Sequence, residues 1–268
     1  MPEEPMLRGE AEAALDDVRA STAFLTRLPS QWLGPMAGAR PDFRRAARVF
    51  PAVGALVGLV GGAVLVIAVW LHIPSLVAAS LAVLATMIFT GALHEDGLAD
   101  TVDGFGGGAT AARKLEIMDD SRIGTYGTSA LIFSILLRVA ALASLMPLGS
   151  FRAALALVAA EAVSRAAMVR LWQELPAARL GGLAHETGPP DHQAMVIALV
   201  LGLVIAIVLV WPAVGFWAAV LGILLVLAAT YIFTRLSYRE IGGRTGDTLG
   251  ACQQIAVIAF LVGVAAAA

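Results

Sequence analysis

The sequence predicts an all-α, polytopic integral membrane protein with about seven transmembrane helices and a cytoplasmic N-terminus. Three observations predict this class: 59% of the residues are hydrophobic, only 14% are charged, and the mean hydropathy is +0.83. A soluble domain averages about 25% charged residues, and one of 268 residues could not bury this much apolar surface. The apolar segments are continuous runs, which argues against an outer-membrane β-barrel.

Seven apolar stretches approach the roughly 20 residues that a spanning helix needs. They lie at 51–71, 75–93, 127–146, 151–170, 194–211, 214–234 and 250–267. Short connections that contain proline, at His72–Pro74, Pro147–Ser150 and Pro212–Ala213, indicate helix pairs joined by tight turns. The whole chain, residues 1–268, is therefore expected to form one membrane-embedded domain.

Basic residues orient these spans. Arginines cluster between residues 27 and 48, and Lys and Arg recur in the second, fourth and sixth connections, whereas the opposite connections hold essentially only Arg152. The positive-inside rule then places the N-terminus in the cytoplasm. Residues 1–48 are expected to form a cytoplasmic or interfacial segment, with an amphipathic helix over 11–28 and, as the alternative for residues 1–12, a partly ordered tail. The net charge of −2 gives no reason to expect nucleic-acid binding.

The segment HEDGLADTVDGFGGG, residues 94–108, directly follows the second predicted span. On a helix, Asp100 lies about 40° from Asp96 and Asp103 about 20° to its other side, so the three carboxylates share one face. Like charges on one face repel each other, and a divalent cation would relieve that repulsion. Oxygen ligands suit Mg²⁺, and a cluster of Cys and His that would suggest zinc is absent from the sequence. The alternative is a solvated acidic helix end.

Two further polar segments are candidates for binding an anion. In ARKLEIMDDSRIGTYG, residues 112–127, Lys114 and Arg122 could hold phosphate or could anchor the loop at the cytoplasmic side. In GGRTGDTLGA, residues 242–251, glycines surround Thr245 and Asp247 at the start of the last span, where backbone amides can receive an anion. Asp247 could add a metal ligand or could cap the helix.

Several charged or polar residues fall inside the predicted spans or beside them. Glu161 and Arg165 have the i,i+4 spacing of a helix ion pair, and Arg138 lies within the third span. A structural pair is the favoured interpretation of Glu161 and Arg165, with Arg165 also a candidate to contact substrate. His94 is turned away from the acidic face and is expected to make a structural hydrogen bond, and Glu95 is expected to be an interfacial charge.

An acidic metal site, basic groups and a glycine-rich turn on one side of the membrane are the parts that phosphoryl transfer requires. The same segments resemble those of the cobalamin synthases, or adenosylcobinamide-GDP ribazoletransferases. The resemblance rests on FLTRLP at 24–29, FPAVGALVG at 50–58, HEDGLADTVDG at 94–104, KLEIMDDSRIGTYG at 114–127 and GGRTGDTLGA at 242–251. Glu95 departs from the family pattern, where an apolar residue is expected, but leaves the three aspartates in place.

The resemblance implies a prokaryotic inner-membrane enzyme whose active site faces the cytoplasm. Such enzymes join adenosylcobinamide-GDP to α-ribazole, or to its 5′-phosphate, and release GMP in a reaction that requires Mg²⁺. The corrinoid would need a broad cytoplasm-facing cavity. Further candidate partners are the lipid bilayer, a second copy of the chain and other enzymes of cobalamin assembly.

The resemblance also implies roles for individual residues. Asp96, Asp100 and Asp103 would hold Mg²⁺ against the diphosphate. The ribazole 3′-hydroxyl would attack the phosphorus nearer cobinamide, with Asp103 or Asp247 accepting its proton. The candidate substrate-binding residues are Arg27, His94, Lys114, Arg122, Arg165 and Thr245.

Two other functions compete with this one. A CDP-alcohol phosphotransferase also places aspartates and glycines at a helix end, but Asp100 stands where its pattern requires Arg, and the later aspartates are missing. A cation-coupled transporter could line a path with Glu161, Arg165 and Arg138. Transporters usually show an inverted repeat and sites near the midplane, whereas no repeat is evident in the sequence and its richest polar clusters lie at the membrane surface.

Overall fold

A computed structural model describes residues 3–34, 42–179 and 188–268. These residues form helices, with one isolated β-bridge between Ala177 and Arg244, so the all-α prediction is confirmed for the described part. The helices are α1 (Glu3–Leu25), α2 (Ser30–Leu33), α3 (Phe43–Ala46), α4 (Phe50–Trp70), α5 (Ser75–Thr90), α6 (Leu93–Gly107), α7 (Ala111–Met118), α8 (Thr125–Ser144), α9 (Ser150–Glu174), α11 (His192–Ala213), α12 (Phe216–Ile241) and α13 (Gly246–Ala266).

Five segments of the described chain are long and apolar enough to cross a membrane, compared with the seven predicted. They are Phe43–Trp70, Thr125–Leu148, His192–Ala213, Phe216–Ile241 and Gly246–Ala266. The predicted span 151–170 corresponds to α9, which is long enough but carries charged residues along its length, among them Glu161 and Arg165. The number of spans rises to six only if α5 and α6 count as one.

The predicted span 75–93 ends early because the chain bends sharply after Thr90. Gly91 and Ala92 both adopt left-handed backbone conformations, with φ of 67° and 56°, and α6 leaves α5 at an angle of 90°. The acidic residues of α6 therefore do not continue along the axis of α5. Helix α6 is not itself among the five candidate spans of the described chain.

Helix α9 occupies the centre of the molecule, where it packs against α4, α11 and α13. Glycines on α4 allow the closest of these approaches: a Cβ at Gly58 would lie 2.5 Å from the Cα of Val158, and one at Gly54 would lie 2.2 Å from the carbonyl oxygen of Glu161. Close backbone contact through small residues is the usual means of helix association in lipid. This close packing against α9 explains why α4 contains regularly spaced glycines.

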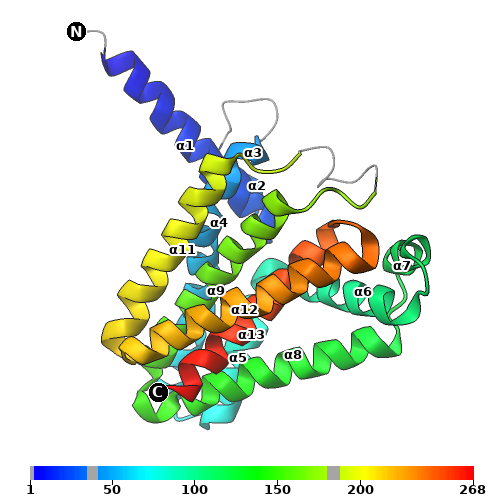
Figure 1. Cartoon of the computed structure of the whole chain (residues 1–268). Helices are drawn as coiled ribbons and strands as arrows, with labels where there is room; N and C mark the ends of the chain where they lie inside the picture. Colours follow the sequence, from blue (N-terminus) through cyan, green and yellow to red (C-terminus); the bar gives the residue numbers. More distant parts are fainter. Residues whose placement is uncertain (1–2, 35–41, 180–187) are drawn as a thin grey trace.

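The helix ends fall into two groups (Figure 1). The connections 71–74, 145–149 and 214–215 lie together with the C-terminus at the lower end of the view, while α6, α7 and the turn 242–245 lie at its right-hand side. These are the two sets of connections that the charge pattern separates. The structure thus groups the basic and acidic segments on one side of the bundle, and the cytoplasmic location of that side remains a prediction.

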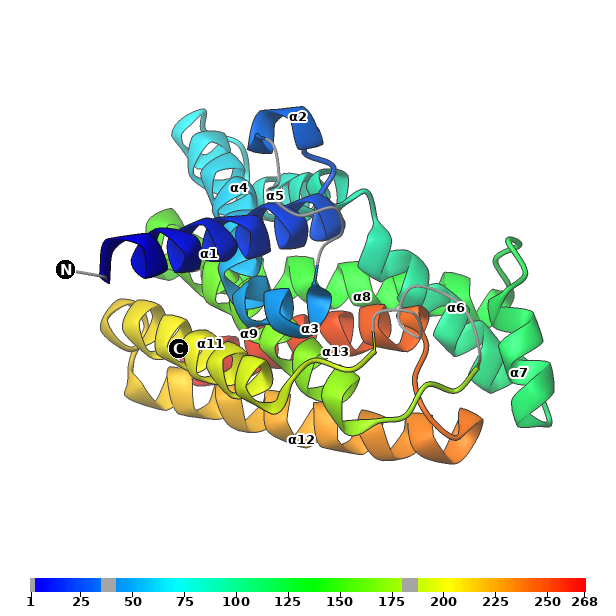
Figure 2. The same ribbon diagram turned by 90° about the horizontal axis from the view of Figure 1, so that it is seen from above.

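Helix α1 includes the predicted amphipathic helix and lies across the bundle near α3 and α4 (Figure 2). The carboxylate of Asp17, only 3% exposed, holds it there through ion pairs of 2.8 Å to Arg45 and 2.7 Å to Arg48. The end of α1 packs into the core, because Leu25 is fully buried. This contact brings the first sequence motif, residues 24–29, next to the start of α6.

Candidate functional site

The acidic segment and the glycine-rich segment meet where α6 crosses α13. A Cβ at Gly97 would lie 2.8 Å from the carbonyl oxygen of Asp247, and one at Gly250 would lie 3.2 Å from the Cα of His94. At position 97 only glycine permits this approach, since real Cβ atoms essentially never come closer than 3.0 Å to such atoms, and at position 250 a Cβ would be tightly packed. The two motifs, about 150 residues apart in the sequence, therefore form one site.

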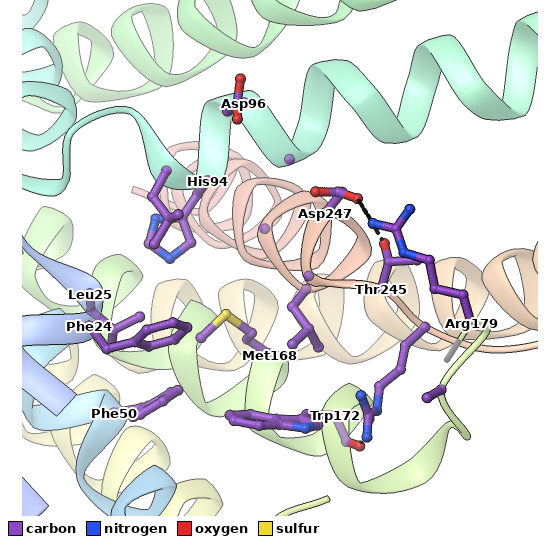
Figure 3. A pocket seen from close by; sticks show the side chains of 17 residues that line it. Phe24, Leu25, Phe50, His94, Asp96, Met168, Trp172, Arg179, Thr245 and Asp247 are labelled. Carbon is purple, nitrogen blue, oxygen red and sulfur yellow. Dashed lines mark hydrogen bonds and ion pairs between the residues drawn. The ribbon is translucent and has the colours of Figure 1, made fainter. Parts of the chain in front are cut away.

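A cavity of about 270 Å³ opens beside this crossing (Figure 3). Its floor is apolar and its rim is polar. The floor includes Phe24, Leu25, Phe50, Met168 and Trp172, and the rim includes Asp96, Arg179, Thr245 and Asp247. The ring centroids of Phe50 and Trp172 are 6.1 Å apart, which gives the floor an aromatic surface. The cavity is much smaller than the broad, corrinoid-sized one that was expected, because side chains from α1, α4 and α9 fill the space beneath the rim.

Carboxylates gather at the rim of this cavity, where Asp96 and Asp247 line it, and beside the rim, where Asp100 lies. Asp96 is exposed and Asp100 is partly buried on the same face of α6. Partial burial, and then the negative charges of Asp96, Asp247, Asp103 and Asp119, raise the pKa of Asp100 to about 7. The surrounding protein therefore supplies too little positive charge to neutralise these carboxylates.

Asp103 has turned away from the other two predicted metal ligands. Its Oδ2 accepts a hydrogen bond of 2.7 Å from the N–H of Gly124, and its Oδ1 accepts one of 2.9 Å from the N–H of Gly127. Both oxygens thus satisfy backbone donors at the start of α8, which need such partners. Among the described residues no three His, Cys, Asp or Glu side chains are arranged to hold a metal ion. The expected three-carboxylate arrangement is therefore not assembled in this structure.

Thr245 and Asp247 begin α13 at the rim. The Thr245 hydroxyl accepts a hydrogen bond from the N–H of Thr248, as a helix cap does, and donates one of 3.1 Å to Oδ2 of Asp247. The sequence left open whether Asp247 is a cap or a ligand. The structure assigns the cap to Thr245 and turns the carboxylate of Asp247 toward the cavity (Figure 3).

Arg179 is a rim residue that the sequence reasoning did not select. Its guanidinium forms an ion pair with Asp119 and lies 3.7 Å from Oδ2 of Asp247. Arg244 holds this part of the chain in place, because its backbone pairs with Pro176 and Ala178 and its Nε donates to the carbonyls of Trp172 and Leu175. The only signal for Arg179 in the sequence is its position in one of the two longest polar loops.

The basic residues that were predicted to bind phosphate do not line this cavity. Lys114 is buried in an ion pair with Glu240 of α12. Arg122, with a side chain 87% exposed, pairs with Asp120 on the outer surface. Arg27 lies against the bend, where a Cβ at Gly91 would meet its side chain. Lys114 and Arg122 thus have structural or surface partners instead of positions on the rim.

The charged residues inside the bundle form a closed network. Arg165 pairs with Glu161, as predicted, and is fully buried. Arg138 pairs with Glu95 at 2.9 Å, so Glu95 is a buried partner and not the interfacial charge that was expected. Gln253 and Gln254 connect the two pairs through hydrogen bonds to Glu161 and Glu95.

This network leaves little space for a transport path. The cavity that Glu161, Arg165 and Arg138 line has a volume of about 10 Å³, no more than one water needs. His94 lines both this small cavity and the one beside the α6–α13 crossing, and its Nε2 is buried without a hydrogen-bond partner among the described residues. The structural hydrogen bond expected for His94 is therefore not formed, and its imidazole separates the network from the cavity beside the crossing.

Comparisons with known proteins identify the family of this chain. Residues 17–265 match the protein family described as cobalamin-5-phosphate synthase. The adenosylcobinamide-GDP ribazoletransferase of Azorhizobium caulinodans is 51% identical over 251 residues, 93% of this chain and 95% of that relative. Proteins of the same name from Rhizobium etli and Brucella anthropi are 46% and 42% identical over 257 residues, 95% of this chain and 97% and 98% of the relatives. No solved structure matches the chain. On the family match and these identities, the chain belongs to the cobalamin-5-phosphate synthase family.

Proposed function

We propose that this chain transfers the phosphorylated cobinamide of adenosylcobinamide-GDP to α-ribazole, or to α-ribazole 5′-phosphate, with release of GMP. One observation carries the proposal: Asp96 of α6 and Asp247 of α13 meet at the rim of a cavity that has an aromatic floor, and Asp100 lies close enough for both charges to raise its pKa. The names of the relatives give the reaction class, and the arrangement of charge suits phosphoryl transfer, in which the protein mainly positions groups and offsets negative charge.

We further propose that Asp96 and Asp100 hold Mg²⁺ together with the phosphates of the substrate. Their oxygen donors suit this ion, which commonly binds through one or two carboxylates plus phosphate oxygens. The raised pKa of Asp100 supports the fit, since it reflects burial first and the neighbouring negative charges second, and a bound cation would offset both. When bound, Mg²⁺ would offset the charge of the diphosphate and of the departing GMP. Asp103, whose two oxygens accept backbone hydrogen bonds, is assigned a structural role instead.

Asp247 is the residue we assign as general base. In the proposed step the 3′-oxygen of ribazole forms a bond to the phosphorus nearer cobinamide, and the bond between that phosphorus and the GMP oxygen breaks. The hydroxyl proton passes to a carboxylate oxygen. The contacts of Thr245 and Arg179 both engage Oδ2 of Asp247, so we assign the proton to Oδ1.

The size and lining of the cavity suggest which parts of the substrates enter it. A volume of about 270 Å³ suits one flat ring system with its phosphates, not a corrinoid. The aromatic floor formed by Phe50 and Trp172 can stack on such a ring. The corrinoid would remain outside the rim, on the side of the protein that we propose faces the cytoplasm of a prokaryotic cell.

The test uses the purified full chain in lipid nanodiscs with adenosylcobinamide-GDP, Mg²⁺ and either acceptor. GMP and the corrinoid product are followed by chromatography. We expect equal amounts of both products, lost with EDTA and reduced at least about 100-fold in Asp96→Asn and Asp100→Asn. Asp120→Asn is the matched control, because Asp120 pairs with Arg122 away from the cavity. Full activity in EDTA would contradict the metal site, and a folded wild type inactive with both acceptors would contradict the function.

A further inference from the structure

We propose that Arg179 binds the diphosphate of the nucleotide substrate, and that it does so by leaving Asp247. This inference rests on the proposed function and adds to it a residue that the sequence motifs do not contain. Arg179 lies on the rim, on the same side of the cavity as Thr245 and Asp247 (Figure 3). Its guanidinium can therefore reach a group bound beside the carboxylates.

The backbone just before Arg179 is held by hydrogen bonds, whereas the side chain of Arg179 is partly exposed. The N–H of Ala178 donates to the carbonyl of Arg244 at 2.9 Å, and the N–H of Arg244 donates to the carbonyl of Pro176 at the same distance. A Cβ at Gly243 would lie 2.3 Å from the Pro176 oxygen, so this pairing requires glycine there. The side chain of Arg179 remains 33% exposed. The guanidinium can thus change partners without movement of the loop.

The present contacts of Arg179 are of a kind that a bound diphosphate can replace. The contact with Asp247 is 3.7 Å long, beyond the length of a hydrogen bond, and the partner Asp119 is 62% exposed. Partly exposed ion pairs stabilise a protein little. A diphosphate offers paired oxygens that match the planar fork of a guanidinium in bidentate hydrogen bonds. The nucleotide is therefore expected to replace the weaker contact, the one with Asp247.

Of the other basic side chains near the site, Arg27 lies against Gly91 outside the cavity lining, and the remaining three are engaged elsewhere. Arg244 lines the cavity but is buried and bonds to the carbonyls of Trp172 and Leu175. Lys114 pairs with Glu240, and Arg122 pairs with Asp120 on the surface. Arg179 is thus the partly exposed cation that the described part of the chain presents at the rim.

The exchange has a consequence for the reaction. While Arg179 lies beside Asp247, the carboxylate faces a positive charge. Once the diphosphate has drawn Arg179 away, Asp247 is available to accept the proton of the acceptor hydroxyl. Binding of the nucleotide would therefore prepare the base, which links the two substrates without any larger conformational change.

The test measures binding apart from turnover, with GDP as the nucleoside diphosphate probe and Mn²⁺ as the metal probe, on the full chain in nanodiscs. For Arg179→Gln we expect GDP affinity in Mg²⁺ to fall at least about tenfold, as loss of a charge-assisted bidentate contact implies. Affinity for Mn²⁺ without nucleotide should stay within about twofold, because Arg179 touches neither Asp96 nor Asp100. Arg179→Lys should retain part of the GDP affinity, since it keeps the charge but not the fork. Arg122→Gln, the matched exposed arginine, should change neither affinity.

Two results would overturn the proposal. Unchanged GDP affinity in Arg179→Gln would show that the residue does not bind the diphosphate, and a parallel loss of GDP and Mn²⁺ affinity would show that it only supports the site. Failure of the proposed function would look different: the wild type would bind GDP but would release no GMP from adenosylcobinamide-GDP with either acceptor.

Discussion

Gly97 of α6 lies directly against the backbone of Asp247, the first acidic residue of α13. A Cβ at position 97 would come within 2.8 Å of the Asp247 carbonyl oxygen and 3.0 Å of its Cα. The contact places the carboxylate of Asp247 beside those of Asp96 and Asp100, which lie on either side of Gly97 in the sequence. The spacing between two helix backbones thus determines the geometry of the candidate site.

Gly97→Ala should therefore impair the site more than the fold. The added methyl group must separate α6 from α13, at a cost of about 1–3 kcal/mol for overpacking. A shift of Asp247 by a fraction of an ångström should lower kcat by about tenfold or more. The control is Gly107→Ala on the same helix, where the atom within 4 Å is Ile117 Cδ1, at 3.3 Å. Equal activities of the two variants would show that the α6–α13 spacing does not control the reaction.

Substitutions of Asp103 and Asp100 should have different effects: the first should lower stability, and the second should lower activity. In Asp103→Asn an amide NH₂ replaces one of the oxygens that face the N–H groups of Gly124 and Gly127. The free energy of unfolding should fall by about 1–3 kcal/mol, the usual effect of an unpaired buried donor. Asp100→Asn should abolish turnover without lowering the thermal midpoint. If Asp103→Asn kept full stability but lost Mn²⁺ binding, Asp103 would be a ligand after all.

The raised pKa of Asp100 predicts how stability depends on pH and on metal. An ordinary aspartate titrates near 3.8, whereas Asp100 titrates near 7 in the folded protein. Between these values the folded state binds more protons than the unfolded state, so its stability falls as the pH rises through this window. The stabilising effect of Asp100→Asn should therefore be larger at pH 8 than at pH 5, and Mg²⁺ should reduce it at pH 8. Thermal unfolding at the two pH values, with and without Mg²⁺, measures both effects.

Features of the fold that are determined by residues close together in the sequence could be predicted from it. Long apolar runs give α4, α8, α11, α12 and α13, and the i,i+4 spacing of Glu161 and Arg165 predicts their ion pair. The bend after α5 could not be predicted, because the apolar run continues through it and left-handed Ala92 has no sequence signature.

The candidate site shows the same division. Asp96 and Asp100 share a helix face, which their spacing predicts. The position of the Arg179 side chain depends on contacts with Asp119 and Asp247, 60 and 68 residues away along the chain. The orientation of the Asp103 carboxylate depends on a hydrogen bond from the start of α8. Such contacts follow from how the helices pack, and a single sequence does not contain that information.

The last prediction concerns Glu95 and Arg138, which pair at 2.9 Å with side chains 5% and 3% exposed. Replacing either one by Leu leaves the other charge buried and unpaired, which should cost about 3–5 kcal/mol. The double replacement removes both charges and should cost clearly less than the sum of the two single replacements.

A double-mutant cycle measured by unfolding in detergent gives the coupling energy. Arg170 and Glu174, an exposed i,i+4 pair at 3.3 Å, provide the control cycle, and their coupling should stay below about 1 kcal/mol. Additive single replacements at Glu95 and Arg138 would mean that each charge finds another partner, such as Gln254, whose amide already donates to Glu95 at 3.1 Å. Strong coupling would instead show that this pair contributes to the contact between α6 and α8, together with the hydrogen bonds of Asp103.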